Sequence, residues 1–371
     1  MKILRFEAEG FRNMKELCFL PSPGINLIAG ENGQGKTNLL EAIWLFTGMR
    51  SFRGAKDREM IGFDGQHAAL SLSFQTEQRE QRASLCFLRG NPVEKQASLN
   101  GVPLEHASKL FGALRAVVFS PEHLSLVKGG PEERRRFLDS ALSQSRPSYL
   151  KLLRQYNRIL SQRNALLKAN VSREVLHATI EGWDAQLSKV GSYITLMRAD
   201  YVEKLAEQAG SYYDGISSGR EAFSMRYHST IFCKRQEGVS YTNGIINYYY
   251  DRLQSHLGED IRLGFTGCGV HRDDLRLTVA GKDARSFASQ GQQRSAVLSL
   301  KLAECELLRE ASGDAPCVLL DDVMSELDHG RRMFLMEHLS DMQVFITGTE
   351  AMDIPLEGAC FHVHDGVLSP G

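Results

Sequence analysis

The chain has 371 residues, 42% of them hydrophobic and 24% charged, a mixture typical of a soluble globular protein and unlike that of a disordered chain. Lysines and arginines number 44 against 45 aspartates and glutamates, so a polyanion would have to bind a local basic surface. The seven cysteines are scattered and include no Cys-x-x-Cys pair, so we expect no zinc site, no disulfide framework and a cytoplasmic location. Neither a run of about 18 apolar residues nor a signal-like start occurs, so we expect no membrane span.

The first 120 residues show patterns typical of strands, with one helix among them. Residues 3–11 and 24–30 are predicted strands, and the second is an apolar run that ends at glycine and delivers the chain into a loop. A helix is expected from Lys36. Short alternating runs with an Asn100-Gly101 turn then predict an antiparallel hairpin sheet; these runs are residues 67–74, 82–88 and 96–104. Residues 115–120 are predicted to form another buried strand.

The middle of the chain is predicted to be helical. From about Pro131, leucine and isoleucine recur at spacings of three and four residues, and a strand-like pattern resumes near Ile261. We therefore expect an α/β fold in which residues 1–125 plus 260–371 form one domain and residues 126–259 form an inserted helical lobe. This insertion of roughly 130 residues is interrupted and too short for the long coiled-coil arm that sustained heptads would give.

The last third of the chain returns to alternating strands and helices. Residues 274–287 show the alternation and the Gly281 turn of a hairpin. A helix is expected over about residues 291–309, and the apolar runs 315–323 and 343–349 predict core strands.

A phosphate-binding loop is predicted between the second strand and the first helix. Residues 30–37 match G-x-x-x-x-G-K-[ST] in the strand-loop-helix context that the mechanism requires. Glycines let backbone N–H groups turn toward phosphates, and the helix N-terminus adds partial positive charge. Lys36 would contact the β- and γ-phosphates of ATP and Thr37 would bind Mg²⁺. The candidate nucleotide-binding residues of this loop are Gly30, Glu31, Asn32, Gly33, Gln34, Gly35, Lys36, Thr37 and Asn38.

The matching carboxylates follow the apolar run that ends near residue 320. Asp321 is the candidate Mg²⁺ ligand, and Asp322 would stand nearer the γ-phosphate, where a carboxylate can orient or activate water. The alternative for Asp322 is a carboxylate that merely ends a strand. About 280 residues separate the two halves of this site, which indicates a large insertion between them.

A second anion-binding helix start is predicted at Ser289. Serine and glycine open the apolar-periodic helix that precedes the carboxylates, so Ser289, Gly291 and Gln292 are further candidate nucleotide contacts. Because the phosphate loop already occupies one side of a nucleotide, a second such helix start suggests that the nucleotide is enclosed between two surfaces.

These motifs resemble those of known ATPases. The stretches SQGQQRS and VLLDDVMSELD resemble the signature helix, Walker B strand and D-loop of ABC-type ATPases, and GENGQGKTNLLEAI is similar to the phosphate loop of their SMC branch. Nearly end to end, the chain resembles the RecF family of bacterial recombination mediators, through FRN at 11–13, RSFR at 50–53, FSPEHLSLVKGGPEERRRFLD at 119–139 and HRDD at 271–274.

This resemblance implies an ABC-type P-loop ATPase head with an antiparallel β subdomain and the helical insertion. It implies a homodimer that forms with ATP, each nucleotide lying between the phosphate loop of one subunit and Ser289 of the other. It also implies a slow DNA-dependent ATPase that binds double-stranded and gapped DNA and works with RecO and RecR.

The chain departs from the common ABC pattern at three positions. Asp322 stands where glutamate is usual and is one methylene shorter, so slow turnover is expected. Residues 120–124 offer no Q-loop glutamine, and Thr347 takes the place of a switch residue that is histidine in many ABC proteins.

Two basic segments are candidate DNA contacts. Lys151, Arg154 and Arg158 share one side of a predicted helix, with Arg163 and Lys168 beyond them and Arg134 to Arg136 on the preceding helix. A second group, Arg50, Arg53, Lys56 and Arg58, lies in a loop shortly after the nucleotide helix. The alternative is that these are solvated charges without a ligand.

Two other functions use similar site logic. The nucleotide-binding subunit of a transporter shares the motifs but predicts a compact helical subdomain instead of a long arginine-rich insertion. A small-molecule kinase needs a substrate pocket and no second helix start.

The HRDD segment, His271 to Asp274, could be mistaken for a metal site. Its four residues are adjacent in sequence and do not easily converge on one metal ion, so a structural or ATP-sensing turn is expected there.

Overall fold

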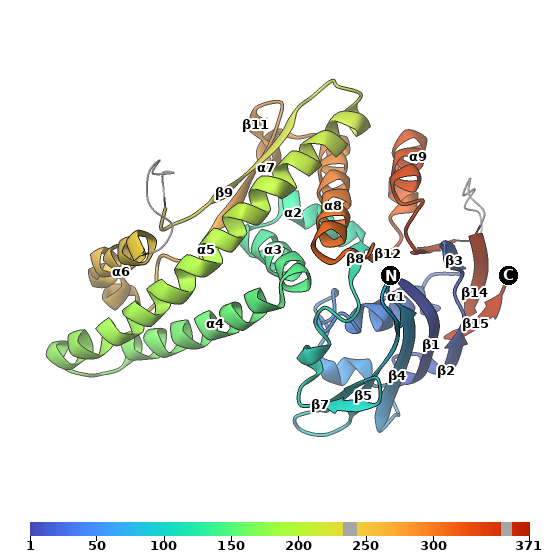
Figure 1. The fold of residues 1–371 in the computed structure, drawn as a ribbon, viewed down its shortest axis with the longest axis horizontal. Helices are drawn as coiled ribbons and strands as arrows, with labels where there is room; N and C mark the ends of the chain where they lie inside the picture. The colour runs from blue at the N-terminus through green and yellow to red at the C-terminus, as the bar shows by residue number, and fades with distance from the viewer. Residues whose placement is uncertain (233–242, 350–357) are drawn as a thin grey trace. The chain divides into compact units, whose positions relative to one another are not determined.

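The computed structural model describes residues 1–232, 243–349 and 358–371 (Figure 1). The strands are β1 (Lys2–Phe11), β2 (Met14–Phe19), β3 (Ile25–Ala29), β4 (His67–Gln75), β5 (Glu80–Leu88), β6 (Glu94–Leu99), β7 (Val102–Leu104), β8 (Ala116–Phe119), β9 (Phe223–His228), β10 (Asp274–Val279), β11 (Lys282–Asp283), β12 (Cys317–Leu320), β13 (Val344–Gly348), β14 (Gly358–His364) and β15 (Val367–Pro370). The helices are α1 (Lys36–Leu45), α2 (Ser125–Lys128), α3 (Pro131–Ser145), α4 (Pro147–Lys168), α5 (Arg173–Ser217), α6 (Asn243–Leu263), α7 (Ala284–Phe287), α8 (Gln290–Ser312) and α9 (His329–His338).

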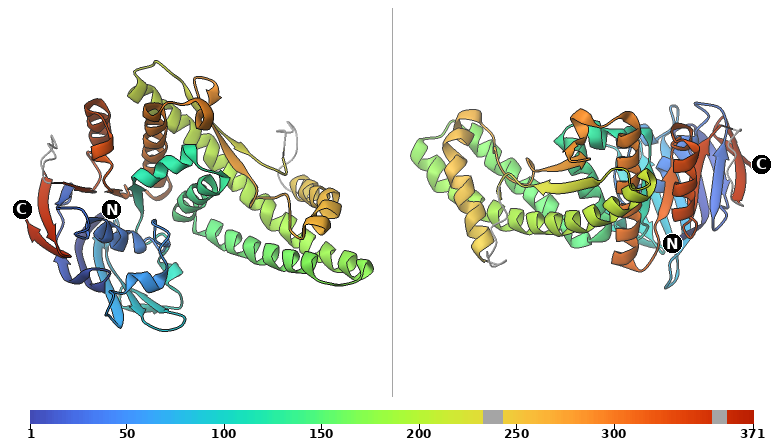
Figure 2. Two further views of the ribbon diagram at one scale, coloured as in Figure 1. Left: turned by 180° about the vertical axis from the view of Figure 1, so that it is seen from behind. Right: turned by 90° about the horizontal axis from the view of Figure 1, so that it is seen from above.

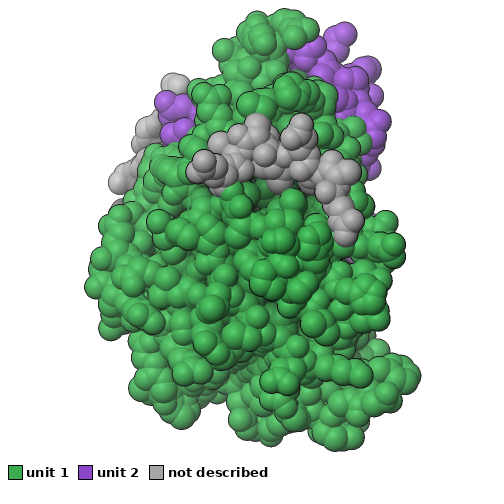
Figure 3. All heavy atoms as spheres, turned by 90° about the vertical axis from the view of Figure 1, so that its right-hand side faces the viewer, with its two compact units in different colours: residues 1–124, 211–220, 293–371 green, residues 125–210, 221–292 purple. Residues whose placement is uncertain are grey.

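The chain groups into two compact units, which Figure 3 colours separately. The first unit comprises residues 1–124, 211–220 and 293–371, and the second comprises residues 125–210 and 221–292. The predicted division places residues 260–292 with the first part of the chain. The compact units group them with the helical segment, because β10 pairs along its whole length with β9. The domain division itself stays a prediction.

A mostly parallel sheet forms the centre of the first unit. Its strand order is β15-β14-β3-β13-β12-β8, with only β15 antiparallel to its neighbour. Every residue of β8, β12 and β13 is buried, as expected for strands covered on both faces. Because β3, β13 and β12 are adjacent and parallel, their carboxyl ends lie at one edge of the sheet. The loop after β3 and the aspartates after β12 therefore meet there.

The predicted hairpin sheet is confirmed as a separate antiparallel layer of the first unit. Its order is β2-β1-β4-β5-β6-β7, and β4 alternates buried and partly exposed side chains along its length. Asn100 and Gly101 both adopt positive φ angles, 52° and 78°, in the two-residue turn that joins β6 to β7. Such a turn matches the right-handed twist of the flanking strands.

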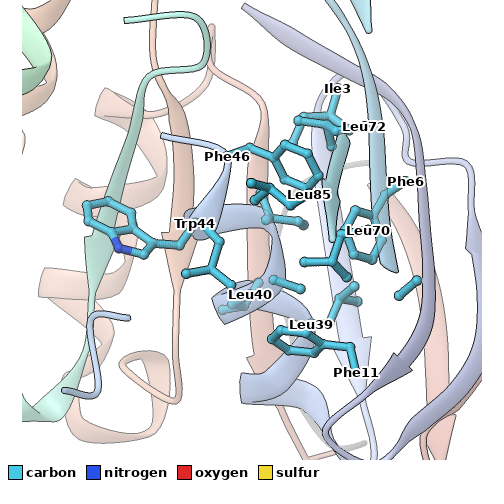
Figure 4. Close-up of a cluster of buried hydrophobic side chains, with 14 of the residues drawn as sticks. Ile3, Phe6, Phe11, Leu39, Leu40, Trp44, Phe46, Leu70, Leu72 and Leu85 are labelled. Atoms are coloured by element: carbon cyan, nitrogen blue, oxygen red, sulfur yellow. The ribbon is translucent and has the colours of Figure 1, made fainter. Parts of the chain in front are cut away.

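Helix α1 is packed between the antiparallel sheet and the parallel sheet. A single cluster of buried side chains includes Leu39 and Leu40 of α1, Phe6 and Leu70 of the antiparallel sheet, and Phe345 of the parallel sheet. Figure 4 shows Leu39 and Leu40 directed toward the side chains of β1 and β4. Most residues of α1 are buried, and most of the buried ones are apolar, as expected for a helix enclosed between two layers. This packing fixes the start of α1 relative to the sheet edge.

The opposite face of the parallel sheet is covered by α8 and α9 (Figure 1). Leu298 and Leu302 of α8 and Leu335 of α9 belong to one buried cluster with Val318 and Ile346 of the strands. The helix predicted over residues 291–309 is thus confirmed as α8, extended by a residue at its start and by three at its end.

The second unit consists of helices and one small sheet of order β11-β10-β9. Leu167, Ile180 and Leu257 pack together in one buried cluster. Figure 2 shows the chain turning back on itself between α4 and α5. The strand-like pattern predicted near Ile261 is wrong, because α6 continues to Leu263. Strand β9 is not predicted from the sequence. No coiled coil is evident in the described residues, and none of their helices is long and apolar enough to cross a membrane.

Candidate functional site

The loop between β3 and α1 has a backbone that only glycine adopts readily. Gly30 has φ 152°, and a Cβ atom there would lie 2.5 Å from the carbonyl oxygen of Val363 in β14. Gly33 and Gly35 also have positive φ angles, of 85° and 112°. Within the described residues no side chain caps the first turn of α1, which begins after Gly35. Its backbone N–H groups can therefore be satisfied by an anion.

Asn13 and the β14–β15 turn hold this loop from outside. Asn13 Nδ2 donates to the carbonyl oxygen of Gln34 at 2.9 Å, and its Oδ1 accepts from Asn38 Nδ2 at 2.7 Å. The backbone N–H groups of Asp365 and Gly366 donate to the side-chain and main-chain oxygens of Gln34, at 2.6 and 3.0 Å. The FRN motif marks Asn13, but its contact with the loop is visible only in the folded chain.

Lys36 points back into the loop that precedes it. Its side chain is buried, and Nζ donates to the carbonyl oxygens of Gly30 at 2.5 Å and Glu31 at 2.9 Å. The ammonium group is therefore held against the backbone of the phosphate loop. Glu31 and Asn32 themselves are exposed.

Thr37 and Asp321 are brought together across 284 sequence positions. Thr37 Oγ1 donates to Asp321 Oδ1 at 2.8 Å, and Thr347 Oγ1 donates to the same oxygen at 3.0 Å. Burial raises the pKa of Asp321, and the two hydroxyl donors oppose that rise. This contact joins the two predicted halves of the site at the carboxyl ends of β3 and β12.

Asp322 adopts the left-handed conformation, with φ 53°, which is uncommon for a residue other than glycine. Its backbone N–H donates to Thr347 Oγ1 at 2.9 Å, and its carbonyl oxygen accepts from Ser325 Oγ at 2.8 Å. Thr347 is fully buried and contacts both aspartates. It therefore supports the carboxylate of Asp321 and the backbone of Asp322.

The segment after β8 contains histidine where a Q-loop glutamine is common. The backbone N–H of Ser120 donates to His123 Nδ1 at 3.0 Å, which closes a short turn. Burial, and secondarily the charge of Lys301, hold the pKa of His123 well below its usual range. A neutral imidazole that accepts a hydrogen bond is consistent with this shift.

Ser289 and Gln292 form a reciprocal cap at the start of α8. The backbone N–H of Ser289 donates to Gln292 Oε1 at 2.7 Å, and the backbone N–H of Gln292 lies 3.3 Å from Ser289 Oγ. Gln292 Nε2 also donates to both carboxylate oxygens of Glu221, at 2.7 Å each. Ser289 is exposed and Gly291 is partly exposed. Ser289, Gly291 and Gln292 belong to the second compact unit, whereas the phosphate loop belongs to the first.

The candidate DNA contacts divide into exposed and buried side chains. Arg50, Arg53 and Lys56 are exposed in the loop that follows α1. Lys151, Arg154 and Arg158 are exposed on α4 and keep the spacing of one helix face.

Two arginines of the predicted basic stripe are buried in ion pairs instead. Arg134 donates from Nε and Nη2 to both carboxylate oxygens of Asp274, at 2.7 and 2.9 Å. Arg163 is fully buried and pairs with Asp184 at 2.5 Å and Asp260 at 2.7 Å. Both guanidinium groups are buried, and their charge is balanced by carboxylate partners within the protein. Neither is therefore a surface cation, although both have the spacing of the predicted stripe. The geometry therefore does not favour Arg134 or Arg163 as a DNA contact.

The HRDD turn directs its two aspartates to different partners. Asp273 accepts from the backbone N–H of Thr230 at 2.6 Å and from the hydroxyl of Tyr227, whereas Asp274 pairs with Arg134. Within the described residues, no group of three or more histidine, cysteine, aspartate and glutamate side chains could hold a metal ion. Of the two readings of this turn, the structural one fits these contacts.

Comparison with known proteins identifies relatives along nearly the whole chain. Residues 2–355 match the family described as RecF/RecN/SMC N terminal domain. The DNA replication and repair protein RecF of Clostridioides difficile (strain 630) is 39% identical over 350 residues, which cover 94% of this chain and 92% of the relative. The protein of the same name from Halothermothrix orenii is 40% identical over 356 residues, covering 95% and 94%.

Solved structures agree with these sequence relatives. The recombination mediator protein RecF with ATPrS in the RecFOR pathway superimposes with a TM-score of 0.90 at 34% identity, covering 99% of this chain and 97% of that one. The structure of RecF with ATP in the same pathway has the same TM-score and identity. The Smc head domain of Pyrococcus furiosus, with a TM-score of 0.56 and 16% identity, shares the fold.

Proposed function

The chain belongs to the RecF family within the RecF/RecN/SMC group, and from this premise we propose that it is an ATP-hydrolysing, DNA-binding recombination mediator. The observation that carries the proposal is the 2.8 Å hydrogen bond between Thr37 and Asp321. It places the end of the phosphate loop beside the strand-end carboxylate, which is the arrangement that a triphosphate and its metal ion require. The solved RecF structures with ATP and ATPrS support the same ligand for this chain.

The loop residues would hold the triphosphate. Backbone N–H groups of residues 30–37 would surround the β-phosphate, and Lys36 Nζ would exchange the carbonyl oxygens of Gly30 and Glu31 for phosphate oxygens. Thr37 Oγ1 and Asp321 Oδ1 are hard oxygen donors, so the pair fits Mg²⁺. Mg²⁺ bound there would neutralise phosphate charge. Asn13 bridges the loop and α1, because it contacts Gln34 in the loop and Asn38 in the first turn of α1.

Asp322 is the proposed residue that orients the attacking water. Its left-handed backbone is held by Thr347 on one side and Ser325 on the other. Because its carboxylate is one methylene shorter than the usual glutamate, water would be oriented less closely, and hydrolysis would be slow. Stimulation by DNA belongs to the same proposal.

ATP would also join two copies of the chain. Ser289, Gly291 and Gln292 of one subunit would contact the nucleotide held by the loop of its partner, using the exposed, capped start of α8. A nucleotide that contacts both subunits only in the dimer stabilises the dimer by mass action. Hydrolysis would then return the protein to monomers.

The dimer would bind duplex DNA and gapped DNA in the cytoplasm. Arg50, Arg53 and Lys56 from the first unit, and the exposed face of α4 carrying Lys151, Arg154 and Arg158 from the second, are the proposed phosphate contacts. The RecFOR pathway to which the solved relatives belong supports RecR and RecO as protein partners.

The test compares dimerisation and duplex binding with ATP, with ADP and in a Lys36→Met variant, across a salt series. We expect ATP alone to give a dimer that binds duplex DNA, and binding to weaken as salt rises, because phosphate contacts release counterions. A protein that binds duplex equally well with ATP, with ADP and with methionine at position 36 contradicts the proposal.

A further inference from the structure

Glu41 is a buried carboxylate on α1, the helix whose first turn carries Lys36 and Thr37. Its side chain has no exposed surface, and a buried charge is costly unless it is paired. Arg12, in the turn between β1 and β2, supplies that pairing. Arg12 Nη2 donates to Glu41 Oε1 at 2.9 Å, and Nε lies 2.5 Å from Oε2. The residue after Arg12 is Asn13, which holds the phosphate loop through Gln34.

The same carboxylate holds the basic loop that follows α1. Ser51 Oγ donates to Glu41 Oε1 and accepts from the backbone N–H groups of Arg53 at 3.1 Å and Ala55 at 3.3 Å. One turn further along α1, Trp44 Nε1 donates to the carbonyl oxygen of Arg50 at 2.8 Å. The backbone of this loop is therefore fixed to the side of α1 through Glu41 and Trp44.

Arg53 extends this arrangement to the edge of the nucleotide site. Its Nη1 donates to Asn38 Oδ1 at 3.1 Å and lies 3.9 Å from Glu41 Oε2, while the side chain remains 40% exposed. One guanidinium group thus contacts both Asn38 and Glu41 of α1 and remains accessible to solvent.

We propose that Glu41 is a positioning residue that couples ATP in the phosphate loop to DNA on the basic loop of residues 50–58. This inference rests on the proposed function. Glu41 is held to the phosphate loop through Arg12 and Asn13 and to the basic loop through Ser51. A shift in the first turn of α1 moves the carboxylate, and the carboxylate cannot leave its partners without leaving a buried charge uncompensated. The two loops therefore move together.

The measurement is the ratio of the duplex-DNA dissociation constants with ADP and with ATP, together with the ATP dissociation constant without DNA. In the unaltered protein we expect a ratio of about 5–150, the usual range of coupling between sites. Glu41→Gln keeps the shape of the side chain but removes its charge. It should bring the ratio below about 2 while changing ATP affinity without DNA by no more than about threefold.

Glu304→Gln is the matched control. Glu304 is a buried glutamate of the same compact unit, and its carboxylate lies 2.5 Å from Lys301 Nζ on α8. Its replacement removes an equally buried charge, so it should lower stability and leave the coupling ratio intact. Ser51→Ala is the milder second variant, because it removes the contact that fixes the basic loop and leaves the pairing with Arg12 in place.

Each outcome decides between the two proposals. If the unaltered protein shows no difference between ATP and ADP, the proposed ATP-dependent clamp fails. If the unaltered protein shows this difference and Glu41→Gln shows it too, the coupling role of Glu41 is overturned. If Glu41→Gln binds ATP more weakly even without DNA, the coupling role is also overturned, and the role of Glu41 is structural. Should Glu41→Gln not fold, Ser51→Ala decides: loss of coupling supports the inference, and full coupling refutes it.

Discussion

Thr347 offers a sharp test of how the two aspartates are held, because one buried hydroxyl serves both. Its Oγ1 donates to Asp321 Oδ1 at 3.0 Å and accepts from the backbone N–H of Asp322 at 2.9 Å. Thr347→Val has nearly the same shape but has neither a donor nor an acceptor. It removes a hydrogen bond to a carboxylate and leaves the partly buried N–H of Asp322 without this acceptor, so we expect a loss of about 2–4 kcal/mol in the free energy of unfolding.

The same substitution should slow ATP hydrolysis. Residues that orient metal ligands from behind are worth about 10–100-fold in metal affinity or activity, and Thr347 contacts the proposed ligand directly. Thr347→Ser keeps the hydroxyl and loses one methyl group, which costs about 1 kcal/mol, so its hydrolysis rate should stay near that of the unaltered protein. The assays are steady-state hydrolysis over a Mg²⁺ series and denaturant unfolding. Equal rates for the valine and serine variants would refute this account of the site.

The other predictions concern stability at defined positions. Burial raises the pKa of Asp321, so its contribution to stability is present below the unfolded value of about 3.9 and is lost as pH rises through the folded value. Asp321→Asn should therefore stabilise the nucleotide-free protein at pH 7 but not at pH 3.5 in denaturant titrations, while abolishing hydrolysis; equal stability at pH 7 would contradict the argument. Gly33→Ala should lower the free energy of unfolding by about 1–2 kcal/mol because its φ angle is positive. Gly30→Ala should lower it further, because the added Cβ would lie 2.5 Å from a carbonyl oxygen. A lower melting temperature for Gly33→Ala than for Gly30→Ala would contradict the loop geometry. Arg163→Ala should lower the free energy of unfolding by about 3–5 kcal/mol, because two buried aspartates lose their cation partner. Arg158→Ala should change the free energy of unfolding by no more than about 0.5 kcal/mol and should reduce the salt dependence of DNA binding by the equivalent of about one phosphate contact. Similar stability losses in the two variants would show that the difference in burial has no energetic consequence.

Much of the fold follows from local pattern, and the site follows from motif spacing. Apolar runs ending at Gly30 and Asp321 predict strands whose loops meet at one sheet edge, and the Thr37–Asp321 contact lies there. Pairing between distant segments is not local information. Strand β9 is visible only through its register with β10, and it groups residues 260–292 with the helical segment in the second compact unit.

Burial of charged residues is equally hidden from sequence. Arg163 has the same helical spacing as the exposed Arg158, but the folded chain brings Asp184 and Asp260 against it. The supporting roles of Asn13 and Thr347 depend on contacts across 21 and 26 positions, which spacing along one helix or strand cannot predict. A glutamate within a helix that begins with a phosphate loop gives no sign that its partners are Arg12 and Ser51.

The measurement that tests the central claim most directly mixes two defective variants and follows their association with ATP by sedimentation velocity. Lys36→Met impairs the loop side of each shared site, and Ser289→Arg blocks the helix side. If ATP lies between two copies, neither variant alone should form an ATP-dependent dimer, whereas a mixed dimer keeps one intact site, with Lys36 from one chain and Ser289 from the other. We expect dimers in the mixture only. A monomeric mixture, or a Ser289→Arg protein that dimerises by itself with ATP, would contradict the shared site.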